Sequence, residues 1–259
     1  MIETLNLRLE KIPLSQIPYF SSTVLDYLNQ DPKLQRFISA YPEIEQFGSV
    51  IKHRNFPLDH REVLVDVLIE QYRRETAPEA VIENIQKLKH ENCFTVTTGH
   101  QLNIFTGPLF FIYKIVSTIN ACRLLKNHYP HFEFVPVYWM ASEDHDFAEI
   151  NHFELFGKQY KWERQWQGAV GRMDLEGMPE LLDQLKECPE LFRKAYLDSD
   201  NLSQATLKVV NQLFGAQGLV SIDADNAHLK RLFIPVMKDD LLNQTAFNCV
   251  MDATEAVSY

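Results

Sequence analysis

Residues 142–146 read Ser-Glu-Asp-His-Asp and follow a very apolar segment that ends in Trp139-Met140. Carboxylates beside an imidazole can act as general acid and base, hold an amine or coordinate a divalent cation. Charge runs are usually solvated turns, but this one directly follows a predicted strand, and that position favours a functional site. We call residues 142–146 the acidic knot. Its predicted catalytic residues are Asp144, His145 and Asp146, and its predicted binding residues are Ser142 and Glu143. We assign no metal ligand, and a metal requirement stays open.

A second group of polar residues surrounds two glycines, in the segments 98–101 and 106–108. A glycine after a strand lets backbone N–H groups approach an anion, and the N-terminus of the next helix adds a positive field. A histidine beside it could hold a phosphate. Neither G-x-G-x-x-G nor G-x-x-x-x-G-K-[ST] is present, and a turn glycine with a solvated histidine is the alternative. The predicted nucleotide- or substrate-binding residues are Thr98, Gly99, His100, Gln101, Thr106, Gly107 and Pro108.

Asp223 follows another short buried run, 219–222. An acid at such a strand end contacts a ribose or an amine, or caps the next helix, and we include Asp223 among the binding residues. Lys114 could reach an anion, but such lysines are more often surface residues. The four cysteines are far apart and form no C-x-x-C pair, which predicts reduced, mostly buried thiols rather than a zinc site.

Three buried runs and one long apolar helix must position these residues. The runs are 93–98, 133–139 and 219–223, and residues 106–128 predict a crossover helix. Its predicted buried face carries Leu109, Ile112, Val116 and Ile119 and is widened by Tyr113, Ile115 and Cys122. Thr106 is its predicted N-cap. This order predicts an α/β fold with a Rossmann-like parallel sheet. In such a sheet, residues 98–101 and the acidic knot should open on one cleft at the carboxyl edge.

The remaining segments predict two regions, a mainly helical leader over residues 1–90 that packs on the core and a Rossmann-like core over 91–259. The leader has a possible strand at 5–9 and helices at 61–74 and 78–90. In the core, residues 152–166 predict a hairpin that turns at Gly157-Lys158. Helices are predicted at about 178–187, 189–196 and 201–214, and from 226 onward. We expect the chain to be the N-terminal part of something longer, with an apolar face left on its last helix.

Composition excludes several classes of protein. The chain has 259 residues and a formal net charge of −10. This balance argues against a nucleic-acid-binding protein, which normally presents a basic face. No run approaches the roughly 20 apolar residues that span a bilayer, and the N-terminus lacks a signal-peptide pattern. We expect a cytoplasmic protein without membrane or nucleic-acid partners.

The motifs together resemble the cysteine-adding ligases of bacillithiol biosynthesis. The similarity rests on Thr-Gly-His-Gln, Phe-Thr-Gly-Pro-Leu, Tyr-Lys, Val-Pro-Val-Tyr-Trp-Met-Ala, the acidic knot and Glu-Ile-Asn-His, which span about 95–152. It implies a fold similar to class I aminoacyl-tRNA synthetases and nucleotidylyltransferases. It also implies ligation of cysteine to the amine of glucosaminyl-malate, with ATP or another nucleotide activating the carboxylate, and Asn151 as a binding residue. Many family members have glutamine in place of His100, so the family does not require that histidine.

The same resemblance implies a homodimer for the full-length protein, through a coiled coil beyond these residues. We therefore expect an amide-forming ligase, whose isolated 259-residue chain does not complete the reaction. Two alternatives stay open. One is a nucleotidyl-transferring enzyme of the same fold that acts on another small acid, and the other is a non-catalytic binding module.

Overall fold

The structure is a computed structural model that describes residues 10–257. The chain separates into two compact units: residues up to His53 together with those from Met237 onward, and Arg54–Val236. Helices α3 (Leu58–Tyr72) and α4 (Glu79–Lys87), from the predicted leader, belong to the same unit as the sheet. The predicted division at residue 90 stays a prediction about domain organisation. Within residues 10–257 no helix is both long and apolar enough to cross a bilayer.

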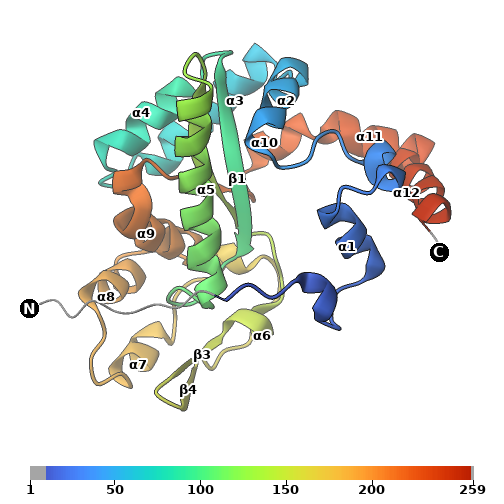
Figure 1. The fold of residues 1–259 in the computed structure, drawn as a ribbon. Helices are drawn as coiled ribbons and strands as arrows, with labels where there is room; N and C mark the ends of the chain where they lie inside the picture. The colour runs from blue at the N-terminus through green and yellow to red at the C-terminus, as the bar shows by residue number, and fades with distance from the viewer. Residues whose placement is uncertain (1–9, 258–259) are drawn as a thin grey trace, which may run out of the picture. The chain divides into compact units, whose positions relative to one another are not determined.

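The second unit is built on a three-stranded parallel sheet (Figure 1). Its strands are β1 (Cys93–Gln101), β2 (Glu133–Ala141) and β5 (Val220–Asp223), in the order β1-β2-β5. β1 and β2 pair in parallel from Cys93↔Glu133 to Gln101↔Ala141, and β2 pairs with β5 from Val137↔Val220. The predicted parallel sheet of three runs is thus confirmed, and the fold is Rossmann-like.

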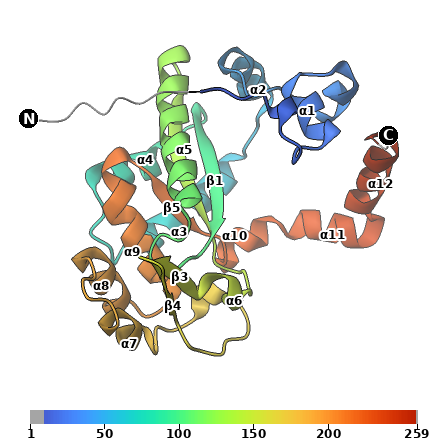
Figure 2. The same cartoon turned by 60° about the horizontal axis from the view of Figure 1, so that its bottom comes forward.

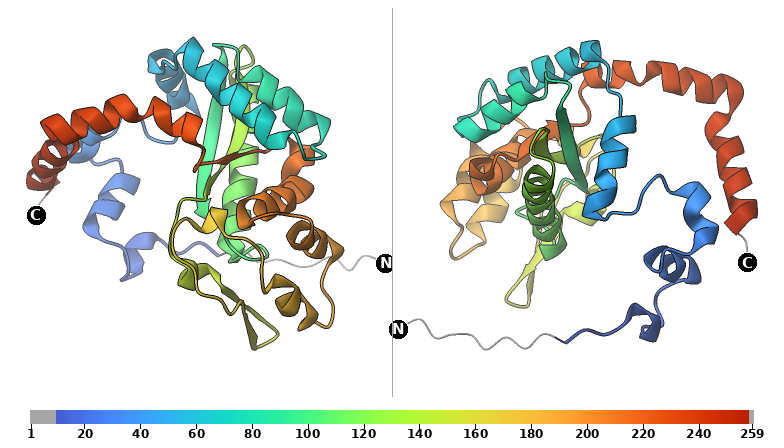
Figure 3. Two further views of the ribbon diagram at one scale, coloured as in Figure 1. Left: turned by 180° about the vertical axis from the view of Figure 1, so that it is seen from behind. Right: turned by 45° about the horizontal axis from the view of Figure 1, so that its top comes forward.

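Helices cover both faces of this sheet (Figure 3). α5 (Leu109–His128) connects β1 to β2 and packs on both, and α9 (Leu202–Phe214) lines a shallow pocket together with it. α3 and α10 (Ala227–Leu232) lie over the opposite face, where they enclose an apolar pocket of about 250 Å³ with Trp139 in its wall. α4 packs on α3 and on the sheet.

Helix α5 is confirmed as the crossover, but its predicted buried face is only partly right: Ile115, Ile119 and Cys122 are buried, whereas Leu109 and Val116 are not. Leu109 is 66% exposed and Val116 is 40% exposed. Because α5 is apolar on nearly every side, periodicity alone could not identify the face toward the sheet. The buried residues are Phe111, Ile115, Thr118, Ile119, Cys122 and Leu125.

The start of α5 also differs from the prediction. Pro108, not Thr106, is its N-cap, and no side chain caps its first N–H groups. Phe105 and Gly107 both have positive φ, at 59° and 57°, so the chain turns twice before the helix can begin. A Cβ on Gly107 would lie 2.7 Å from Cβ of Asn103, which gives a second reason for glycine there.

Side chains of α3 cover the outer edge of β5. The Gln71 amide donates from Nε2 to the carbonyl oxygen of Ser221 at 2.9 Å and accepts from N–H of Asp223 at 2.9 Å. The Tyr72 hydroxyl accepts from N–H of Ser221 at 2.8 Å, and burial raises the pKa of Tyr72 to about 12. One glutamine and one tyrosine thus replace a neighbouring strand. Among the described residues, β1 has a strand partner on one side only.

Small elements extend beyond the carboxyl ends of β1 and β2 (Figure 2). They are α6 (Phe147–Ile150), the hairpin β3 (His152–Leu155) and β4 (Lys158–Lys161), α7 (Met178–Asp183) and α8 (Glu190–Leu197). The predicted hairpin is confirmed, but its turn is Phe156-Gly157 rather than Gly157-Lys158, because Lys158 already pairs with Leu155. Its second strand ends at Lys161. From Trp162 the chain forms a loop, because the Trp162 indole is buried and bonded to the carbonyl oxygen of Glu176 at 2.9 Å. The three predicted helices correspond to α7, α8 and α9.

The first unit is helical over its described residues. It contains α1 (Ser22–Leu28), capped by Ser21, and α2 (Phe47–His53).

From Asn226 onward, the single predicted helix is three: α10, α11 (Ile234–Asn243) and α12 (Thr245–Val257). As expected, apolar side chains near the end of the chain are exposed, Leu241 by 82% and Phe247 by 60%. The predicted strand at 5–9 lies outside the described residues. The 3-10 helices are Leu14–Gln16, Pro32–Phe37, Ile44–Gln46, Val170–Arg172 and Gly215–Gln217.

Candidate functional site

Gln101, the last residue of β1, joins the two predicted site segments. Its Nε2 donates to Oδ2 of Asp144 at 2.7 Å and to Oε2 of Glu149 at 2.9 Å. The parallel register places the end of β1 beside the end of β2, with Gln101 opposite Ala141, so the loops that follow must be neighbours. The amide thereby holds two carboxylates together at the carboxyl edge of the sheet.

Within the acidic knot, the Asp144 side chain is held by hydrogen bonds, whereas the His145 side chain is exposed. Asp144 Oδ1 accepts from N–H of Asp146 at 3.1 Å. This bond and the bond from Gln101 hold the pKa of the Asp144 carboxyl below its ordinary value. The His145 side chain is 87% exposed, with Nδ1 at 3.8 Å from Asp144 Oδ1. An anchored carboxylate therefore lies beside an accessible imidazole.

The end of β1 carries a separate set of contacts. Lys114, in the second turn of α5, donates from Nζ to the carbonyl oxygen of Gly99. His100 lies edge-on to Phe111 with ring centroids 5.5 Å apart, and its Nδ1 is 3.0 Å from Nδ2 of Asn103. A Cβ on Gly99 would meet only ordinary contacts, the nearest at 3.7 Å. Packing alone does not require glycine at position 99.

Asp223 ties the acidic knot to β5. Its carboxylate accepts from the hydroxyls of Ser142 and, at 2.7 Å, Ser203, and from N–H of Asp225 at 2.9 Å. Ser142 is 1% exposed. These bonds engage both carboxylate oxygens of Asp223 inside the protein. The predicted substrate contact of Asp223 stays a prediction.

An open cleft of about 550 Å³ lies next to the acidic knot. One wall consists of residues 145–148 and Asn151, and the other of residues 164–167. Backbone bonds fix the second wall to the first at both ends: Trp162 N–H donates to the carbonyl oxygen of Asn151 at 2.7 Å, and Val170 N–H donates to that of Asp144 at 2.7 Å. The cleft is thus a fixed feature of the second unit.

The predicted site residues divide between these places. His145, Asp146 and Asn151 line the cleft. The segments 98–101 and 106–108 lie at the end of β1 and before α5, and none of their residues lines the cleft, contrary to the prediction of one shared cleft. Gln101 nevertheless joins the first segment to the knot through its bond to Asp144. Glu143 is exposed. Within residues 10–257, no three His, Cys, Asp or Glu side chains are grouped so that they could hold a metal ion.

Sequence reasoning missed part of the cleft and one carboxylate. Glu149 shares the Gln101 amide, and Arg164, Gln165, Trp166 and Gln167 form the second wall. The alternation of aromatic and polar residues there predicted a strand. No signal in the sequence indicated that the loop after β4 is bonded to the acidic knot.

Comparison with known proteins agrees with this architecture. Residues 7–259 match the family model described as Bacillithiol biosynthesis BshC, N-terminal Rossmann-like domain. A protein of Flavobacterium johnsoniae named "Putative cysteine ligase BshC" is 45% identical over 249 residues, which cover 92% of this chain and 47% of that protein. A protein of the same name from Cytophaga hutchinsonii is 44% identical over 245 residues, which cover 95% of this chain and 47% of that protein. The chain spans about half the length of the curated relatives it matches. It belongs to the BshC family of bacillithiol biosynthesis, and what it spans is the N-terminal Rossmann-like domain.

Proposed function

We propose that the chain supplies the sheet-containing half of a ligase that joins cysteine to the amine of glucosaminyl-malate, after a nucleotide such as ATP activates the cysteine carboxylate. The observation that carries this proposal is the bond from Gln101 Nε2 to Asp144 Oδ2 at 2.7 Å. It unites the glycine turn, suited to an anion, and the acidic knot, suited to an amine, at one sheet edge. The names of the relatives support a cysteine ligase.

The end of β1 suits the activating nucleotide. The first N–H groups of the 20-residue helix α5 have no side-chain cap, and they point a positive field toward the strand end. Lys114 Nζ is held nearby by the Gly99 carbonyl, with further ammonium protons available for a phosphate or a carboxylate. Positions 98–101 and 106–108 would surround this anion.

The acidic knot suits proton transfer from the amine. In amide formation the amine nitrogen bonds to the activated carboxyl carbon, the bond from that carbon to the activating phosphate oxygen breaks, and the nitrogen loses a proton. His145 is exposed enough to accept that proton, and Asp144 would orient the imidazole. Asp146 and Asn151 would hold the acceptor. A homodimer and a cytoplasmic location belong to this proposal for the full-length protein.

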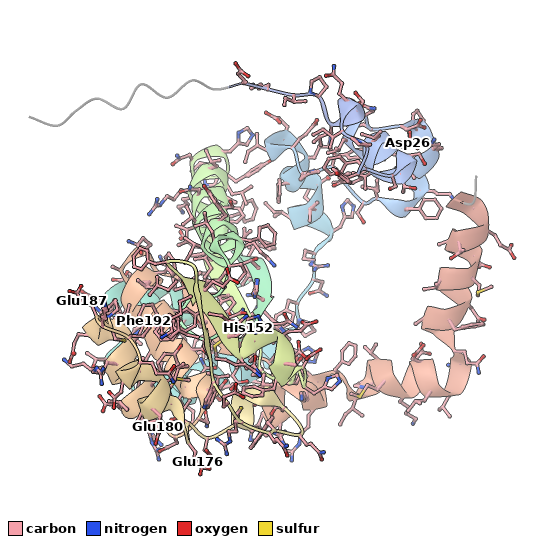
Figure 4. The ribbon with its side chains drawn as sticks, turned by 90° about the horizontal axis from the view of Figure 1, so that it is seen from below. Asp26, His152, Glu176, Glu180, Glu187 and Phe192 are labelled. Atoms are coloured by element: carbon pink, nitrogen blue, oxygen red, sulfur yellow. The ribbon has the colours of Figure 1, made fainter. Side chains whose placement is uncertain are left out.

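The test uses a chain extended to the length of the relatives. It is incubated with cysteine and glucosaminyl-malate, with and without ATP, and the product is measured by mass. We expect an ATP-dependent product that Asp144→Asn and His145→Ala reduce by roughly 10²–10⁴-fold, as for loss of acid–base catalysis. Glu187→Gln is the matched control, because Glu187 is an exposed carboxylate that does not line the cleft. It also lies well away from His152 (Figure 4). Full activity of both site variants would refute the proposal.

A further inference from the structure

We propose that the cleft beside the acidic knot binds a hydroxyl-rich amine of the amino-sugar class, and that it excludes phosphate. This inference deepens the proposed function, because it assigns the acceptor substrate to a place separate from the nucleotide. It adds the loop after β4, in particular Gln165, Trp166 and Gln167, to the site.

The cleft has the size and rigidity of a binding site. Its volume of about 550 Å³ falls in the range of roughly 300–1,000 Å³ that small-molecule sites occupy. Its second wall is fixed at one end by Trp162 N–H to Asn151 and at the other by Val170 N–H to Asp144. Gly171 N–H adds a third bond, to the carbonyl oxygen of Ser142 at 2.8 Å. A cleft whose walls are already positioned loses little entropy when a ligand binds.

The charge of the lining favours a cation. Arg164 is the cationic side chain of the second wall, but its guanidinium is bound to Asp174 and lies 3.5 Å from Glu176. The bond to Arg164 lowers the pKa of Asp174 to about 2, so this pair stays charged and matched at neutral pH. Asp146 adds a carboxylate to the lining. Its Oδ1 accepts from N–H of Glu149 at 3.4 Å, and within the described residues no cationic side chain is paired with it. An ammonium group gains from this field, whereas a phosphate is repelled.

The remaining lining groups suit hydroxyls on a ring. Gln165 and Gln167 are exposed amides, each able to donate and accept hydrogen bonds. Asn151 is only 6% exposed yet lines the cleft, which gives it a fixed amide. The half-buried Trp166 indole offers an apolar surface, with the Arg164 guanidinium 5.6 Å from its ring centroid. Amides around an aromatic surface match the alternating hydroxyls and C–H groups of a sugar.

The position of the cleft fits the chemistry. His145 and Asp146 belong both to the acidic knot and to the cleft lining. An amine held by Asp146 would therefore lie next to the imidazole that accepts its proton. The nucleotide would lie on the other side of Gln101, at the end of β1.

The three tryptophans provide the test, because their indole N–H signals report on different places. The 259-residue chain is labelled with ¹⁵N and titrated with glucosamine, with glucosaminyl-malate, with glucose and with inorganic phosphate. We expect the two amines to shift the Trp166 signal, glucose to need a roughly tenfold higher concentration, about 1.4 kcal/mol, and phosphate to leave it unchanged. The Trp139 signal should not move, because Trp139 lines the separate apolar pocket of the sheet.

Two variants sharpen the result. Gln167→Ala and Asp146→Asn should each weaken amine binding roughly tenfold, while Glu187→Gln should not. An unresponsive Trp166 signal, or one that phosphate shifts as strongly, overturns this inference. If the extended chain nevertheless ligates cysteine, only the assignment of the cleft is wrong. If the amines bind at Trp166 but no ligation occurs, the proposed function is wrong and the amine site stands.

Discussion

Replacing Gly171 by alanine should separate the two walls of the cleft. A Cβ at this position would lie 2.5 Å from Cβ of Ser142 and 2.8 Å from its carbonyl oxygen. Ser142 is 1% exposed and bonded to Asp223, so it has no room to move. The strain must be relieved by moving the loop, which breaks the bonds of Val170 and Gly171 to the knot.

The expected loss in the free energy of unfolding can be estimated either from overpacking or from the broken hydrogen bonds. Overpacking of a fixed core costs about 1–3 kcal/mol. Loss of two backbone hydrogen bonds costs about 1 kcal/mol each. Both give about 2 kcal/mol, and at about 2–4 °C per kcal/mol for a chain of this size the Tm should fall by about 4–8 °C.

Thermal unfolding by circular dichroism measures this effect, with Gly99→Ala as the matched control. Gly99 also lies at the carboxyl edge of the sheet, but its added Cβ would be 3.7 Å from the nearest heavy atom, which is an ordinary contact. Gly99→Ala should therefore change the free energy of unfolding by less than about 0.5 kcal/mol, and its Tm should stay close to that of the wild type. A Tm for Gly171→Ala equal to that of Gly99→Ala would show that the loop is not fixed to the knot.

Further predictions concern the core, the titration of the knot and the network on β5. Ile115→Ala should lower the free energy of unfolding by about 2–5 kcal/mol in denaturant titrations, because Ile115 is fully buried, whereas Leu109→Ala should stay within about 0.5 kcal/mol. NMR titration of the Asp144 carboxyl should give a pKa below its ordinary value, and Gln101→Leu should raise it. Because this folded pKa is depressed, the associated stability is present above the unfolded pKa and is lost as pH falls through the folded value; an unchanged titration in Gln101→Leu would contradict the reasoning. Asp223→Ala should cost about 1–3 kcal/mol in the same denaturant titration, since buried serine hydroxyls lose their acceptor, and wild-type stability would contradict that role.

The sequence was sufficient to predict the strands of the sheet, but not the full buried face of α5 or the loops around the sheet. β1, β2 and β5 were predictable because buried runs of apolar residues between polar breaks have few alternatives. The buried face of α5 was predictable only in part, because Leu109 and Ile115 are equally apolar and only the sheet distinguishes them. The place of the acidic knot followed from parallel strand geometry. The cleft wall at 164–167 depends on bonds between residues far apart in sequence, which no local pattern encodes.

The bonds from Gln71 and Tyr72 of α3 to the outer edge of β5 limit how copies of this chain can aggregate. Exposed strand edges are the usual starting points for ribbons that grow without end. Here Gln71 and Tyr72 already occupy the backbone groups along the outer edge of β5. If two copies met through their β1 edges, the joint sheet would present only β5 edges outward, and a third copy would find no free partner groups. Association through the sheet edges would therefore stop at two copies, because two side chains of the neighbouring helix α3 block further pairing at β5.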